Sequence, residues 1–276
     1  MDQINAFYNG VYDLLENIKV SPLSRAYTFS DSVYEVVPFV RGESIAHSLH
    51  MDRLKKSSEN LNITFNLSLV SSEIKTLIDN CKSKNGYVYY QISRGIDEIR
   101  SHIHSSNITN ETFGYAKPYE FKIKGIKVLM CDDLRWGRCD IKSTSLLGNV
   151  MQMNEANKYN CEEVIMFKGE NITEGGASNV FFVKNNEICT PSLSSNILPG
   201  ITRSLLIENL KKKNIVVNES KYTLKDLKEA SSIWFTSSTK PIAPVIEVRD
   251  INKSFDLNDD LYLESLEVLK LSLIHI

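Results

Sequence analysis

The chain has 276 residues, of which 42% are hydrophobic and 24% charged, and its formal net charge is −2. This length suffices for one large domain or two domains of modest size, and the composition is typical of a soluble globular protein. The small negative charge argues against a nucleic-acid partner or an anionic membrane surface, and no apolar run reaches the roughly 20 residues of a spanning helix. The five cysteines form no CxxC pair and the N-terminus MDQINAFYNG shows no secretory signal, so we expect reduced thiols in a cytoplasmic protein.

The first half of the chain predicts strands and helices in irregular alternation. An Asn9-Gly10 pair between apolar flanks is a strong signal for a hairpin turn. Residues 95–118 show little periodicity and predict a long loop, and such loops in compact proteins are usually functional or disordered. The other predicted elements are a hairpin over 5–13, a strand over 33–40, a helix spaced by Leu49, Leu54 and Leu61, a helix spaced by Ile74, Leu77, Ile78 and Cys81, and a strand over 87–93.

The second half repeats this mixture. It opens with a strand-like run from Leu134 to Ile141, which ends at a single lysine, Lys142. The elements predicted after it are a helix over 146–159, strands over 162–168, 179–183 and 187–190, a helix over 201–213, a strand over 215–219, a short helix from Thr223, strands over 232–236 and 245–249, and a helix near 260–271. Because strict βαβ alternation is missing, we expect two α/β or α+β lobes, 1–117 and 122–276, with Lys117-Pro118 at the boundary.

Lys142 is the first candidate catalytic residue. It follows an apolar and aromatic segment that contains Trp136, Cys139 and Ile141. Basic residues usually lie in solvated loops, whereas a lysine desolvated at the end of such a segment suits Schiff-base chemistry. The alternative is a lysine that snorkels from a strand end into water.

The sequence RCDIKSTSLLGN around Lys142 resembles the lysine-bearing motif of the fold-type IV pyridoxal-phosphate (PLP) enzymes. Several further blocks, from about Ser30 to the C-terminal LIHI, match in the same order, and the D-amino acid aminotransferases are the most similar. The resemblance implies a two-lobed, mixed α/β fold and PLP bound to Lys142 as a Schiff base. It also implies transamination between a D-amino acid such as D-alanine and a 2-oxo acid such as 2-oxoglutarate, in a homodimer whose neighbouring subunit completes the active site.

A phosphate site is predicted where Pro199-Gly200 precedes a helix that begins with Ile201. Free amides and the positive end of the dipole at a helix start favour an anion, although these residues alone also fit an ordinary turn. Arg53 alone fits a solvated helix arginine, but its planar fork suits a phosphate. By the resemblance to the family's GITR block, the cofactor phosphate is bound by the amides of Ile201 and Thr202, by Ser237 and Ser238, and by Arg53.

Glu174, in ITEGGASN, is the candidate partner of the cofactor ring. Alone, a glutamate before two glycines is most often a turn residue. A carboxylate that faces a pyridine nitrogen keeps it protonated, and the protonated ring then accepts electrons from a carbanion. The resemblance to the family's TEG-x-x-SN block implies this role for Glu174, although Ala177 stands where the D-aminotransferases have serine.

Arg100 and His102 lie two residues apart in the predicted long loop, so both can point at one carboxylate. The alternatives are an exposed basic loop and a metal site at His102-x-His104, for which no third ligand cluster is visible, so no metal is expected. The resemblance implies that the pair reaches over from the neighbouring subunit and binds the substrate α-carboxylate together with Tyr34. This loop is one residue longer before Arg100 than the family pattern, and Ser32 replaces its usual glycine.

Several functions stay open on the residues alone. The same scaffold serves branched-chain L-amino acid aminotransferase, (R)-amine transaminase and aminodeoxychorismate lyase, and the preference for D-amino acids rests on the resemblance, mainly on Arg100-x-His102. A non-catalytic PLP- or phosphate-binding protein and a metal-dependent hydrolase centred on His102 and His104 are alternatives from other classes.

Overall fold

The computed structural model describes residues 4–255 and 257–274, and their contacts divide into two compact units. The first unit comprises the chain up to residue 120 together with 141–145, and the second comprises 121–140 and the chain from 146 onward. Lys142 therefore belongs to the first unit by its contacts, which differs from the sequence-based division into 1–117 and 122–276. Among the described helices, none is long and apolar enough to cross a membrane.

The first unit is built on an antiparallel six-stranded sheet with the order β2-β1-β6-β5-β3-β4. The Asn9-Gly10 hairpin is confirmed, and both turn residues have positive φ. Residues 111–118 were predicted as loop but form a strand, because they pair with β5 along its whole length. The strands are β1 (Asn5–Tyr8), β2 (Val11–Leu14), β3 (Ser32–Val40), β4 (Glu43–Ser44), β5 (Gly86–Ser93) and β6 (Glu111–Pro118).

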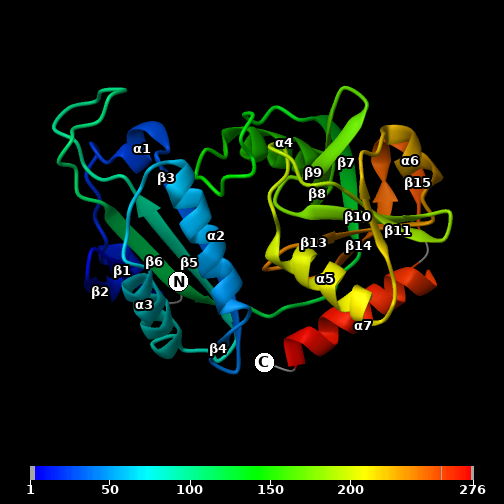
Figure 1. The fold of residues 1–276 in the computed structure, drawn as a ribbon, viewed down its shortest axis with the longest axis horizontal. Coiled ribbons are helices and arrows are strands. Elements are labelled where there is room, and N and C mark those ends of the chain that lie inside the picture. The colour runs from blue at the N-terminus through cyan, green and yellow to red at the C-terminus, as the bar shows by residue number, and fades with distance from the viewer. Residues whose placement is uncertain (1–3, 256, 275–276) are drawn as a thin grey trace. The chain divides into compact units, whose positions relative to one another are not determined.

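Helices α2 (His47–Asn60) and α3 (Leu67–Asp79) cover one face of this sheet (Figure 1). Their apolar side chains, among them Leu54, Ile74 and Leu77, form one core with the inward residues of β3 and β5. A short helix α1 (Arg25–Phe29) and the 3-10 turn η1 (Leu15–Asn17) precede β3. Tyr34 of β3 and the alternate residues Tyr87 and Tyr89 of β5 are half-buried, and Tyr34 stacks on Tyr89 with ring centroids 5.5 Å apart.

The second unit has a mixed nine-stranded sheet with the order β12-β11-β10-β13-β14-β7-β8-β9, and β15 pairs with β14. The strands are β7 (Ile126–Asp132), β8 (Glu163–Lys168), β9 (Asn171–Gly175), β10 (Asn179–Lys184), β11 (Glu187–Pro191), β12 (Val217–Ser220), β13 (Ser232–Thr236), β14 (Ala243–Val248) and β15 (Lys253–Ser254). The helices are α4 (Leu147–Lys158), α5 (Ile201–Lys212), α6 (Leu224–Glu229) and α7 (Asp260–Ile274), with the 3-10 turn η2 (Arg249–Ile251). Figure 1 shows α5 and α7 running side by side. Apart from the strand predicted over 134–141, the predicted helices and strands are confirmed here, whereas β7, β9 and β15 were not predicted.

The strand predicted over 134–141 is wrong, because this segment runs through bends and a turn. Its backbone bonds to another loop instead, since the amide of Cys139 donates to the carbonyl of Ser195 at 2.7 Å. The side chain of Arg135 also turns inward and is only 5% exposed. Of its apolar residues, Cys139 and Ile141 are buried, whereas Leu134 and Trp136 are 61% and 41% exposed. The apolar composition of the segment thus predicted neither a strand nor uniform burial correctly.

Candidate active site

Lys142 lies half-buried in the first unit, against the N-terminal part of β3. The amide of Tyr34 donates to the carbonyl of Lys142 at 3.0 Å, and the amide of Lys142 donates to the hydroxyl of Ser57 at 3.2 Å. The amine Nζ lies 4.2 Å from the centroid of the Tyr34 ring, a cation–π distance. The sequence-predicted lysine and tyrosine are therefore adjacent, and two backbone hydrogen bonds fix where the lysine side chain begins.

Arg53 is not the solvated helix arginine of the alternative interpretation, because it is only 9% exposed. Its Nε and Nη2 donate to the two carboxylate oxygens of Glu35 at 2.7 and 2.8 Å, and Nδ1 of His50 donates to Glu35 at 2.7 Å. Burial by itself raises the pKa of a carboxyl, but the charge of Arg53 outweighs it and the pKa of Glu35 lies below its usual value. The buried carboxylate thus anchors Arg53 from the strand that also carries Tyr34.

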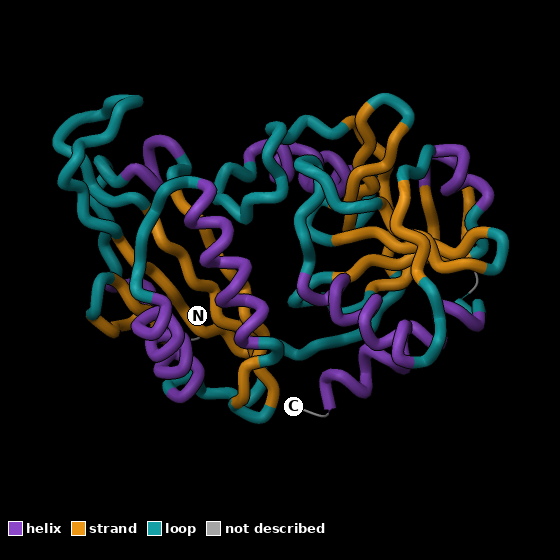
Figure 2. The backbone as a smooth tube through the Cα atoms, viewed as in Figure 1, coloured by secondary structure: helices purple, strands orange, loops and turns teal. Residues whose placement is uncertain are grey.

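Arg100 and His102 are brought together on the side chain of Phe29, the last residue of α1. The guanidinium carbon of Arg100 lies 4.6 Å from the Phe29 ring centroid, and the His102 ring lies 5.4 Å from it. Both basic side chains are exposed. In Figure 2 their loop is the long teal segment that projects from the ends of β5 and β6. Nδ1 of His104 donates to the carbonyl of the neighbouring Ser105 at 2.9 Å, and the described residues contain no group of three potential metal ligands.

Glu174 is the second-last residue of β9 in the second unit, and its buried carboxyl accepts several hydrogen bonds. Asn179 donates to its Oε2 at 2.9 Å, the amide of Leu198 donates to its Oε1 at 3.1 Å, and Arg135 donates to Oε1 as well. Arg135 is shared, because it also donates twice to Asp133, at 2.9 and 2.8 Å. Burial raises the pKa of Glu174 to about 7, against the opposing charge of Arg135.

Two of the predicted phosphate residues, Ile201 and Thr202, follow a turn that is bonded to this carboxylate, since the amide of Leu198 donates to Glu174. Asn179 also donates to the carbonyl of Leu198 at 2.9 Å, and a Cβ on Gly200 would meet Asn179 at 1.9 Å, so only glycine fits at the start of α5. No side chain caps that helix, and its first amides, those of Ile201 and Thr202, have no acceptor within the helix.

The neighbouring Ser237 turn is positioned by strand pairing, since Thr236 lies opposite Asn179 in the ladder of β10 and β13. Within the described chain, the buried hydroxyl of Thr236 has no hydrogen-bond partner. Uncapped amides and spare hydroxyls next to a buried carboxylate are a donor set that fits a phosphorylated pyridine cofactor.

Sequence reasoning missed three residues that contact the candidate site residues. Arg135, the shared partner of Glu174, lies within the motif around Lys142, and its position between apolar residues was the available signal. Glu35 and Phe29 gave no local signal, because each acts through residues distant in the chain.

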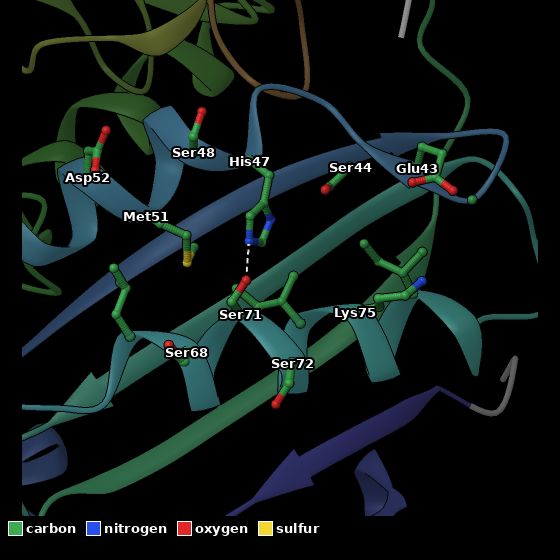
Figure 3. A pocket seen from close by; sticks show the side chains of 14 residues that line it. Glu43, Ser44, His47, Ser48, Met51, Asp52, Ser68, Ser71, Ser72 and Lys75 are labelled. Carbon is green, nitrogen blue, oxygen red and sulfur yellow. Dashed lines mark hydrogen bonds between the residues drawn. The ribbon is translucent and has the colours of Figure 1, made fainter.

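A pocket of about 610 Å³ lies in the first unit between α2 and α3 (Figure 3). His47 points from α2 toward Ser71 of α3, and the two side chains are hydrogen-bonded at 2.6 Å. Burial lowers the pKa of His47. None of the sequence-predicted site residues lines this pocket, so it is separate from the candidate active site.

Residues 32–248 match the sequence model of the class IV amino-transferases. The D-alanine aminotransferase of Listeria monocytogenes serotype 4b (strain F2365) is 34% identical over 243 residues, which cover 84% of this chain and 83% of that relative. The branched-chain aminotransferase of the archaeon Thermoproteus uzoniensis with norvaline aligns with a TM-score of 0.88 at 21% identity, over 97% of this chain and 94% of that one. A candidate 4-amino-4-deoxychorismate lyase of Legionella pneumophila aligns with a TM-score of 0.85 at 20% identity, over 94% of this chain and 97% of that one.

Proposed function

Because the chain belongs to the class IV aminotransferases, we propose that it transfers amino groups between D-amino acids such as D-alanine and 2-oxo acids such as 2-oxoglutarate. The family makes it a PLP-dependent aminotransferase of fold type IV. The D preference is supported by the relative named D-alanine aminotransferase and by the exposed Arg100–His102 pair. That pair carries the proposal, because no carboxylate of the described residues pairs with Arg100.

We assign the covalent link with the cofactor to Lys142, whose amine also moves the substrate Cα proton. PLP supplies a ring that stores the electrons of the broken Cα–H bond when its nitrogen is protonated. Glu174 would hold that proton at the ring nitrogen, since a buried carboxyl whose pKa is raised gains most from a new cationic partner. The phosphate is assigned to the amides of Ile201 and Thr202, to Ser237 and Ser238, and to Arg53.

The substrate α-carboxylate is assigned to Arg100, His102 and Tyr34, with the loop of a neighbouring subunit completing each site of a homodimer. The resemblance supports this assembly, and so does the exposure of the loop, where the side chain of Ile103 is 86% exposed. A cytoplasmic location is proposed as well, because the five cysteines are all free thiols.

The first test uses the purified protein. We expect visible absorbance from bound PLP, and we expect Lys142→Ala to abolish both the absorbance and the turnover. Single-turnover reactions with D-alanine, L-leucine and aminodeoxychorismate then separate the activities of this scaffold. Fast conversion of L-leucine with no reaction of D-alanine would overturn the proposal in favour of a branched-chain aminotransferase, and pyruvate release without an amino acceptor would identify a lyase.

The second test concerns the carboxylate. Arg100→Ala should raise the KM for D-alanine about 10- to 100-fold, because a charge-assisted hydrogen bond to the substrate is lost. An unchanged KM would refute the assignment of Arg100 to the substrate carboxylate.

A further inference from the structure

Phe29 contacts three basic side chains of the first unit. The guanidinium carbons of Arg25 and Arg100 each lie 4.6 Å from the centroid of its ring, and the His102 ring lies 5.4 Å away at an interplanar angle of 55°. Arg100 and His102 are on the long loop, whereas Phe29 and Arg25 are at the two ends of α1. One aromatic ring therefore joins the loop to the helix in front of β3.

Arg25 ties the backbone of the same loop to α1. Its Nη1 donates to the carbonyl of Ser101 at 2.7 Å, and its Nη2 donates to the carbonyl of His102 at 3.4 Å. Asp97 holds the base of the loop by accepting from the amide and the hydroxyl of Ser105. The loop between β5 and β6 is thus fixed at its base and at Ser101–His102, which places Arg100 and His102 over Phe29.

The three basic side chains around Phe29 differ in whether a carboxylate neutralises them. Arg25 is 4% exposed and is neutralised by Asp31, at 2.9 Å, and by Asp97, at 3.5 Å. For Arg100 and His102, the described part of the chain supplies no carboxylate partner. A guanidinium that stacks by its face on an aromatic ring keeps its in-plane N–H donors free for a carboxylate. The cation that remains available is therefore Arg100, and the imidazole of His102 lies against the same ring.

We propose that Phe29 is a positioning residue, whose ring holds Arg100 and His102 side by side as one binding pair for the substrate α-carboxylate. This inference rests on the proposed function, in which these two residues bind that carboxylate. Preorganisation is the physical reason: an arginine and a histidine on a free loop would lose side-chain freedom at each binding event, whereas the ring orders them beforehand. Phe29 itself need not touch the substrate.

The test compares variants of the full-length, PLP-loaded enzyme. Phe29→Leu keeps an apolar side chain of similar size but removes the aromatic face, and Phe29→Tyr keeps the face. We expect Phe29→Leu to raise the KM for D-alanine about 3- to 30-fold, the range that a cation–π contact contributes, with a smaller change in kcat. The inhibition constant of propionate, which has a carboxylate but no amino group, should rise by the same factor, and Phe29→Tyr should restore both values.

Tyr27→Leu is the matched control, because Tyr27 is in the same helix and 75% exposed, and we expect it to change neither constant. Visible absorbance and the thermal midpoint show whether each variant retains cofactor and fold. If Arg100→Ala raises the KM but Phe29→Leu does not, the positioning role is wrong and the carboxylate assignment stands. If Arg100→Ala itself has no effect, the proposed function fails at this point, and a KM effect of Phe29→Leu would then have another cause.

Discussion

Each unit contains a buried glutamate that is paired with an arginine, yet the pKa values of the two carboxyls are shifted in opposite directions from their usual value. Glu35 has Arg53 as a bidentate partner and His50 as a further donor, and its pKa lies below its usual value. Glu174 shares Arg135 with Asp133, and its pKa is raised to about 7. Both are under 5% exposed, so the difference comes from the number of cationic donors that each one receives.

This difference separates an anchor from a binding group. A carboxylate whose charge is fully compensated by its own unit gains little from another cation, and Glu35 holds α2 against β3. A carboxyl that is only partly compensated gains more, because a new positive partner removes the remaining cost of burying its charge. Glu174 is therefore the one suited to a protonated ring nitrogen.

The largest effect is expected for Glu35→Ala. It removes the carboxylate that neutralises the buried Arg53, and breaking a buried ion pair costs about 3–5 kcal/mol. Urea unfolding of the cofactor-free protein measures this loss in the free energy of unfolding. A loss below about 1 kcal/mol would mean that Glu35 is not the anchor of α2.

The next effect separates activity from stability. Glu174→Ala should lower kcat about 100- to 1,000-fold, the loss typical for removing one preorganised electrostatic partner. Its unfolding free energy should fall less than that of Glu35→Ala, because Arg135 keeps Asp133. Steady-state kinetics and urea unfolding measure the two quantities, and intact turnover would exclude Glu174 as the partner of the ring.

The pH dependence gives a third distinction. The pKa of Glu174 is raised in the folded state from 4.5 to about 7, so its proton stabilises the fold fully below pH 4.5, and this stabilisation is lost as the pH rises through 7. At 1.36 kcal/mol per pKa unit the loss is about 3 kcal/mol. We expect cofactor-free Glu174→Gln to lack this part of the pH dependence between pH 5 and pH 8, and equal profiles for both proteins would contradict the raised pKa.

The smallest effect is expected at an exposed ion pair, and it serves as a reference for the larger ones. Lys55 and Glu59 form an exposed pair on α2, with 3.9 Å between the charged atoms, in the same helix as Arg53. Glu59→Gln should change the unfolding free energy by less than about 0.5 kcal/mol, because water already solvates both charges. A change as large as that of Glu35→Ala would show that the whole helix, and not the buried pair, is sensitive to charge.

Sequence motifs identified the candidate residues that are marked by their immediate neighbours in the chain. Lys142 was found from its motif, and the helix that begins at Ile201 was found from the Pro-Gly turn before it. The strand predicted over 134–141 was wrong because strand pairing depends on a partner that composition does not specify, and two of the apolar residues in this segment, Leu134 and Trp136, are exposed. The loop predicted over 111–118 was wrong for a related reason. The alternation of apolar and polar residues is weak there, and the strand forms because the segment pairs with β5.

The sequence by itself indicated the family, through several blocks along the chain. It also singled out the lysine, the helix start that suits a phosphate and the glutamate beside two glycines, because each of these three is encoded within a dozen consecutive residues. Only the tertiary structure decided that Arg135 is shared between Asp133 and Glu174, and that Phe29 carries Arg100 and His102. These contacts join residues up to 73 positions apart, from Phe29 to His102. Their geometry depends on how strands pair and helices pack, which a local pattern does not contain.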